Sequence, residues 1–199
     1  MLMNQQKLEA PLPYREAGIT TKWIPPTVIR WQKQIESSAL KYDIDVNVIA
    51  ILMTMESGGG PKAKSGAGAE GLMQIMPATA QEIAKKHLKQ PVENYDIYDP
   101  ATNIEFGTAY LAWLRDEFGI IQHAPDYNTT VELIAAGYNG GAGAAKAIDD
   151  GEGLRNLETM SYSRDAFYMW RERTSETSPT FDRWKERGGN ALLEAAAKN

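Results

Sequence analysis

Glu56 is the residue whose position best suits acid–base chemistry. It follows Ile49 by seven residues and Leu52 by four, so on a helix it would share their apolar face. A carboxyl group on that face points towards the interior or a cleft. Burial there raises its pKa, and the negative end of the helix dipole acts in the same direction. Such a group suits a general acid that protonates a leaving oxygen. The alternative is an ordinary glutamate that turns out to solvent where its helix ends.

A glycine-rich stretch lies shortly after this acid. Residues 66–71 read G-A-G-A-E-G, which matches the G-x-G-x-x-G pattern of dinucleotide-binding loops. That pattern needs a buried strand before it and a helix directly after its last glycine. Residues 61–65 are Pro-Lys-Ala-Lys-Ser, which is no buried strand, and the chain shows no alternation of β and α segments. The stretch is therefore interpreted as a loop and not as a nucleotide site.

The composition excludes several classes of function. The 199-residue chain has no cysteine and no H-E-x-x-H motif, so we expect no metal site and no cofactor. A net charge of −5 without a basic block argues against nucleic acid as a partner. The longest apolar run, Val48–Met53, is too short to cross a bilayer, so no integral membrane segment is expected. The N-terminus lacks the basic start and apolar core of a secretory signal peptide.

Capping residues, prolines and glycines predict a mostly helical chain. Asp45 is the expected N-cap of an apolar helix that Gly58 ends, and Asp99 with Pro100 begins another helix. The polar and apolar positions of the other segments repeat with helical spacing, and no convincing alternating strand is found. The expected helices cover residues 25–43, 46–57, 77–88, 101–118, 131–139 and 163–174.

The same signals place the domain limits. Thr129 or Thr130 is the expected cap of the helix over 131–139, which the glycine pair at 140 and 141 breaks. After residue 174 the chain becomes polar, with a marginal helix near 191–198. The predicted organisation is an N-terminal tail over 1–23, a single helical domain over 24–175, and a C-terminal tail, partly helical, over 176–199.

Several motifs in a fixed order resemble one family. They are Glu56-Ser57, Ser65, the stretch GAEGLMQIMPATA from Gly68, AGYNGGAG from Ala136, and Glu158-Thr159 followed by Tyr162. Together with the segment DPATNIEFGTAYLAWL, this pattern resembles the catalytic domain of soluble lytic transglycosylases, which share a lysozyme-like fold with goose-type lysozyme. The resemblance covers about residues 27–173. It implies a mostly α, single lysozyme-like (goose-type/SLT) helical domain with little or no β structure.

The resemblance implies a role for each matching residue. Glu56 matches the single catalytic acid/base that cleaves the bond between N-acetylmuramic acid and N-acetylglucosamine of peptidoglycan without water, giving 1,6-anhydromuramic products. Tyr138 matches a tyrosine whose hydroxyl approaches the acid, and Gln74 and Met76 match cleft residues. The residues implied in substrate binding are Ser57, Ser65, Gln74, Met76, Tyr138, Asn139, Glu158 and Tyr162.

Two glycines depart from the family pattern. Gly59 stands three residues after the acid, where the family often has a bulky side chain, and Gly137 stands where alanine is usual. Both changes are expected to loosen the rim of the cleft or to alter which muropeptides bind. Neither change removes the acid.

Two other functions remain open at this point. A hydrolytic muramidase on the same fold needs a positioned water and usually a second carboxylate, for which Asp96, Asp99 and Asp126 are candidates. A protein that binds peptidoglycan without cleaving it, or a structural subunit of a virion, is the third hypothesis. In each case the expected partner is the peptidoglycan glycan strand, bound by a monomer at the bacterial cell wall, in the periplasm or outside the cell. The lack of a signal peptide fits a phage-encoded protein or a trimmed secreted enzyme equally well.

Overall fold

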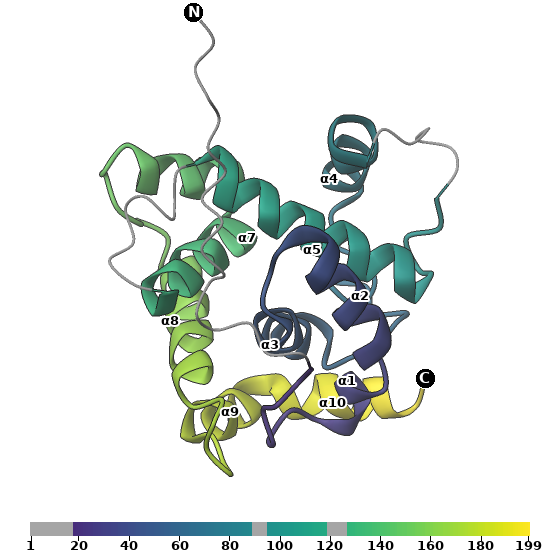
Figure 1. The fold of residues 1–199 in the computed structure, drawn as a ribbon. Coiled ribbons are helices and arrows are strands. Elements are labelled where there is room, and N and C mark those ends of the chain that lie inside the picture. The colour runs from purple at the N-terminus through teal and green to yellow at the C-terminus, as the bar shows by residue number, and fades with distance from the viewer. Residues whose placement is uncertain (1–17, 89–94, 119–126) are drawn as a thin grey trace, which may run out of the picture.

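The computed structural model describes residues 18–88, 95–118 and 127–199. Helices dominate these ranges, and the only pairing of extended backbone among them is two isolated bridges, Lys64 with Glu70 and Glu70 with Ile75. The mostly helical fold is therefore confirmed (Figure 1). The elements are α1 (Pro26–Ile29), α2 (Gln32–Tyr42), α3 (Val46–Ser57), α4 (Pro77–Glu82), the π-helix η1 (Ile83–Leu88), α5 (Pro100–Glu117), α7 (Tyr127–Asp149), α8 (Leu157–Arg171), α9 (Pro179–Trp184), the π-helix η3 (Lys185–Gly189) and α10 (Asn190–Ala197).

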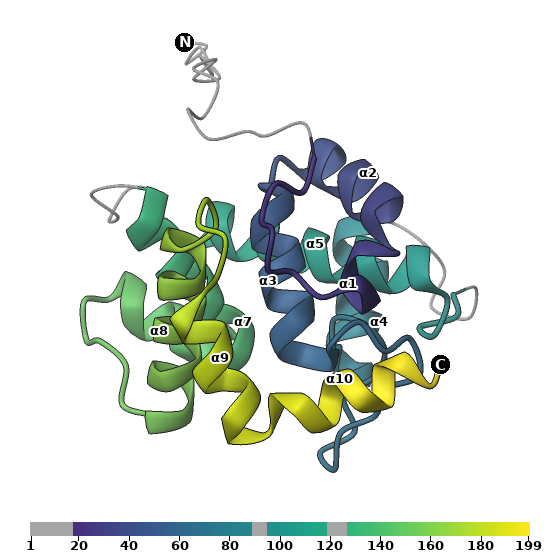
Figure 2. The ribbon, with the colours of Figure 1, turned by 90° about the horizontal axis from the view of Figure 1, so that it is seen from below.

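Helix α3 lies at the centre of the molecule, and the other helices surround it (Figures 1 and 2). Every residue of α3 is buried except Glu56, which is partly exposed. The predicted caps are confirmed, because the Asp45 side chain accepts a hydrogen bond from the backbone N–H of Asn47, and Gly58 ends the helix in the left-handed conformation. Because α3 is buried on all sides, its neighbours hold its last turn in place and thereby fix the position of Glu56.

The glycine-rich loop after α3 is held by one buried side chain. Asn103 of α5 donates hydrogen bonds to the carbonyls of Glu70 and Ile97, and its Oδ1 accepts one from the N–H of Met73. Gly71 is required beside it, since it has φ +79° and an added Cβ would lie 2.1 Å from Nδ2 of Asn103. Gly71 thus allows this loop to pack closely against α5.

Some boundaries differ from the sequence prediction. Helix α7 begins at Tyr127, so Thr129 and Thr130 lie inside it and the predicted cap there is wrong. The predicted break is confirmed at Gly141, whose φ of 74° and ψ of −173° are not helical. The start of α5 is confirmed by a hydrogen bond from the N–H of Thr102 to Asp99. No helix in the described ranges is both long enough and apolar enough to cross a membrane.

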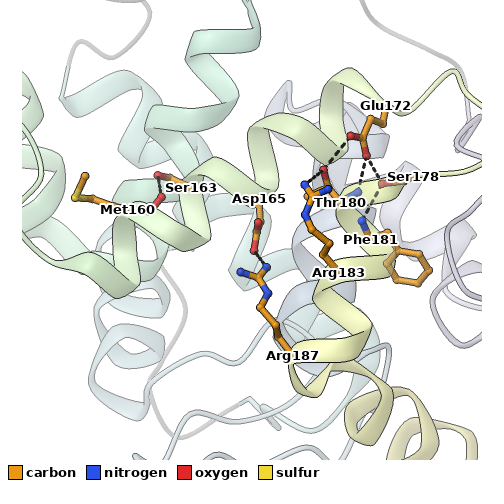
Figure 3. A network of polar contacts seen from close by, with 9 residues as sticks. All are labelled: Met160, Ser163, Asp165, Glu172, Ser178, Thr180, Phe181, Arg183 and Arg187. Carbon is orange, nitrogen blue, oxygen red and sulfur yellow. Dashed lines mark hydrogen bonds and ion pairs between the residues drawn. The ribbon is translucent and has the colours of Figure 1, made fainter.

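The segment that follows residue 178 is helical through Ala197 and packs against the rest of the molecule. We call α9, η3 and α10 together the C-terminal segment (179–197). It contacts α8, α3 and α1, and in Figure 2 it runs beneath the end of α3. The carboxylate of Glu172 joins it to α8, because it accepts hydrogen bonds from the N–H and the hydroxyl of Thr180 and from the hydroxyl of Ser178 (Figure 3). The stretch for which the sequence predicts a partly helical tail thus packs against α3.

Gly59 turns the chain away from α3 where there is no room for a side chain. Its carbonyl accepts hydrogen bonds from Arg30 and from the indole of Trp31. A Cβ at position 59 would lie 2.2 Å from the carbonyl oxygen of Thr27, and the residue has φ +85°. The backbone of α1 therefore fills the space beside Gly59, so this departure does not leave a gap.

We predict that Gly59→Ala lowers the free energy of unfolding by about 2 kcal/mol or more, because it combines backbone strain with a clash against fixed backbone. Urea denaturation measures the change. Gly66→Ala is the matched control, since a Cβ at Gly66 meets nothing within 4 Å. Equal stability of the two variants would contradict the tight turn described above.

Candidate active site

The carboxyl group of Glu56 is hydrogen-bonded to a tyrosine from another helix. The hydroxyl of Tyr162, on α8, donates to Oε1 of Glu56 at 2.6 Å. Burial raises the pKa of Glu56 to about 7, and this hydrogen bond acts in the opposite direction because it stabilises the carboxylate. At neutral pH both protonation states of Glu56 are therefore populated, which is what a group that first gives and then takes a proton requires.

Tyr138 makes a different contact from the one predicted. Its hydroxyl, predicted to approach the acid, donates to the carbonyl oxygen of Met73 at 2.7 Å, and the hydrogen bond to Glu56 comes from Tyr162. The pKa of Tyr138 is raised well above its usual value, first by burial and then by the negative charge of Glu56. Tyr138 is thus a neutral neighbour of Glu56, and its hydrogen bond to Met73 holds the turn that contains Met73 and Gln74.

Four of the predicted residues gather around one pocket. This α7 pocket, of about 210 Å³, is lined by Gln74, Met76, Tyr138 and Asn139, together with Tyr110 and neighbouring residues. Gln74 has φ +47°, and its amide nitrogen donates to the carbonyls of Ala63 and Gly71. The amide of Gln74 is therefore held in one orientation at the wall of the pocket, and Met76 is exposed beside it.

The other two predicted cleft residues line a second pocket. This C-terminal pocket, of about 500 Å³, includes Glu158 and Tyr162 of α8 and Met55, the residue before the acid. Tyr162 is at once part of its wall and the donor to Glu56. Tyr138, whose pKa is raised in part by the negative charge of Glu56, lines the α7 pocket, so each pocket contains one tyrosine that interacts with the acid.

Ser57 and Ser65 are engaged elsewhere. The hydroxyl of Ser57 is buried, donates to the carbonyl of Leu72 at 2.6 Å and accepts from the N–H of Gly59 at 3.1 Å. It joins the end of α3 to the turn that carries Gln74 and has no open face for a substrate. The hydroxyl of Ser65 accepts from the N–H of Ala69 and closes the glycine-rich loop.

Two of the carboxylates considered for a hydrolytic mechanism serve local structure. Asp96 accepts a hydrogen bond from the N–H of Tyr98, and Asp99 caps α5. Asp126 lies outside the described residues. Within the described ranges no group of three or more His, Cys, Asp or Glu side chains is placed to hold a metal ion.

Residues that follow position 175 line one of the two pockets, and the sequence did not predict them as part of the site. Trp184, Arg187 and Leu192 line the C-terminal pocket, although the polar character of this stretch suggested a tail. One signal could have found it: Ser178-Pro179 is an N-cap followed by a proline at the first helical position, and the structure begins α9 there.

We predict that Tyr162→Phe raises the pKa of Glu56 further, because it removes the hydrogen bond that stabilises the carboxylate. An activity that needs protonated Glu56 should then persist to higher pH, so the alkaline limb of the pH–rate profile moves upwards. Tyr138→Phe is the control, since that hydroxyl bonds to Met73 and not to the acid. An alkaline limb that stays in place in Tyr162→Phe would contradict the assignment.

Comparison with known proteins identifies the family of this chain. The family described as Transglycosylase SLT domain matches residues 33–156. The membrane-bound lytic murein transglycosylase C of Glaesserella parasuis is 34% identical over 135 residues, which are 66% of this chain and 36% of that protein. The membrane-bound lytic murein transglycosylase E of Buchnera aphidicola is 32% identical over 147 residues, 72% of this chain and 66% of that protein.

A solved structure gives the same result for the fold. The 70-kDa soluble lytic transglycosylase of Escherichia coli is similar over 74% of this chain and 26% of its own, with a TM-score of 0.55 and 27% identity. The chain thus spans about a quarter to two thirds of the length of the proteins compared with it. The expected lysozyme-like helical domain is confirmed, and this chain belongs to the Transglycosylase SLT domain family.

Proposed function

We propose that this chain is a peptidoglycan lytic transglycosylase with Glu56 as its single general acid/base. Protonated Glu56 gives its proton to the oxygen that links N-acetylmuramic acid to N-acetylglucosamine, and the bond from that oxygen to the anomeric carbon of the muramic residue breaks. The 2-acetamido group of the same sugar assists at the anomeric carbon. The Glu56 carboxylate then takes the proton of the C6 hydroxyl while O6 bonds to the anomeric carbon, which closes the 1,6-anhydro ring.

One observation carries this proposal: a partly exposed carboxyl group with a pKa of about 7 ends a buried helix and is hydrogen-bonded to Tyr162, which lines a pocket. A carboxyl group with an ordinary pKa would be almost fully ionised at neutral pH and a poor proton donor. Gln74, Met76, Tyr138 and Asn139 are proposed to contact sugar on one side of the acid, with Glu158 and Tyr162 on the other. Ser57 and Ser65 are proposed to act through the loop that they hold.

A hydrolytic outcome is the alternative, and the structure offers it less support. Hydrolysis with inversion needs a second carboxylate to activate water on the far face of the sugar. Asp96 and Asp99 are occupied by backbone N–H groups of their own turns, whereas a transglycosylase needs no water and one carboxyl group is enough. Proton transfer from the substrate's own hydroxyl is therefore the favoured second step.

The partner follows from this chemistry. We propose that the chain acts on glycan strands of the bacterial cell wall, in the periplasm or outside the cell, whether it comes from a phage or from a secreted bacterial enzyme. The proposed active unit is a monomer.

We predict that digestion of purified sacculi releases anhydromuropeptides, which mass spectrometry identifies because they are lighter by one water than products with reducing ends. We expect Glu56→Gln to lower kcat/KM by about 10³-fold, since the amide gives no proton to the leaving oxygen. Thermal unfolding of the variant checks that the fold is kept.

Three results would reject this assignment. Products with reducing ends and no anhydro form would establish the hydrolytic muramidase instead. Wall lysis that is unchanged in Glu56→Gln would remove the acid from the chemistry, and no lysis by either protein, with retained binding to sacculi, would favour a non-catalytic binding protein.

A further inference from the structure

The turn after Glu56 packs directly against the backbone of α10. A Cβ at Gly58 would lie 3.0 Å from the backbone of Leu192, and one at Gly60 would lie 3.4 Å from the Cβ of Ala196. Gly58 also has φ +62°, which residues other than glycine rarely adopt. Figure 2 shows α10 running beneath the end of α3, where this turn lies. The two glycines therefore let a second helix approach the end of the helix that carries the acid.

One side chain ties the same turn to α10. The guanidinium of Arg30, the residue that ends α1, donates to the carbonyl of Gly59 at 2.9 Å and to the carbonyl of Ala196 at 3.2 Å. It also lies over the ring of Trp31, 4.9 Å from the centroid, and the indole of Trp31 donates to the same carbonyl of Gly59. Ala196 is in the last turn of α10, at the negative end of the helix dipole, where a cation is stabilising.

The most buried side chain of α10 faces this turn. Ala196 is 1% exposed, and it is the residue that lies against Gly60 and accepts from Arg30. Its neighbours Ala195 and Ala197 are exposed. The family match ends at residue 156, so α10 lies outside the matched region. The most complete burial in α10 thus occurs against the turn that follows the acid.

We propose that α10 is a positioning element for Glu56, and that Arg30 is the positioning residue that joins α10 to the turn after the acid. When α10 is loosened, the turn is freed and the last turn of α3 moves. The carboxyl group of Glu56 then meets the leaving oxygen in fewer of its orientations, which lowers kcat. Neither Arg30 nor Ala196 lines the α7 pocket or the C-terminal pocket, so KM changes little. The proposal rests on the function proposed above.

The test measures kcat and KM on soluble peptidoglycan strands for Arg30→Met and Ala196→Leu. The first variant removes both hydrogen bonds, and the second pushes α10 away from Gly60 because the added atoms find no free space. We expect kcat to fall about tenfold in each variant, with KM within about twofold of the wild-type value. Arg30→Lys keeps a cation that can reach one of the carbonyls, so it should restore part of kcat.

The matched control is Ala197→Leu, which makes the same change on the exposed side of α10 and should keep the wild-type kcat. Thermal unfolding of each variant fixes an assay temperature at which all of them are folded, so that a lower kcat does not reflect unfolded protein. Combining Arg30→Met with Ala196→Leu tests whether both act through one turn. The double variant should then lose about as much kcat as the more damaging single variant.

Amide hydrogen exchange measures the same positioning without catalysis. The amides of residues 55–60 should exchange faster in Arg30→Met and Ala196→Leu than in Ala197→Leu, because the end of α3 opens more often. This result, together with the fall in kcat, supports the proposal.

The proposal is overturned when kcat stays at the wild-type value in both variants, when KM rises as much as kcat falls, when the two losses multiply in the double variant, or when exchange at residues 55–60 is unchanged. Failure of the proposed function is a separate outcome. Wild-type protein that releases no anhydromuropeptide would refute the transglycosylase, and hydrogen exchange would still decide whether α10 holds the turn.

Discussion

A carboxyl group at the end of a buried helix can hold its place only if the backbone that follows is also held. Here the hydrogen bonds around Gly59 meet that need: its carbonyl accepts from Arg30 and Trp31, and its N–H donates to the hydroxyl of Ser57. Buried polar groups require such partners, so the turn has one arrangement and not several. The orientation of Glu56 therefore depends on the hydrogen bonds within this turn.

The two tyrosines beside Glu56 have different roles, since one orients the carboxyl group and the other holds the wall of the α7 pocket. Tyr162 reaches Glu56 from α8, and Tyr138 reaches the carbonyl of Met73 from α7. Because α7 and α8 pack closely against each other, a shift of either helix would move both hydroxyl groups together. This coupling explains how two pockets made from distant parts of the chain stay aligned with one carboxyl group.

Local chemistry determined what could be predicted from the sequence. Asp45, Gly58 and Asp99 mark helix ends through their own side chains or backbone, and the structure agrees with all three. The hydrogen-bond partner of Glu56 depends instead on how α7 and α8 cross α3, which spacing along the chain does not encode. The C-terminal segment was underestimated for a similar reason, since its packing depends on contacts of α10 with α3 and α1, which are distant in the sequence.

The raised pKa of Glu56 also links folding to protons. An ordinary glutamate has a pKa near 4.5, while in the folded chain burial brings the value to about 7. The folded state therefore binds a proton that the unfolded chain has lost at any pH between these values, and this group's effect on stability becomes unfavourable as pH rises through that window. A rise in pH from about 4.5 to about 7 thus weakens the fold through the same side chain from which it removes the proton proposed for catalysis.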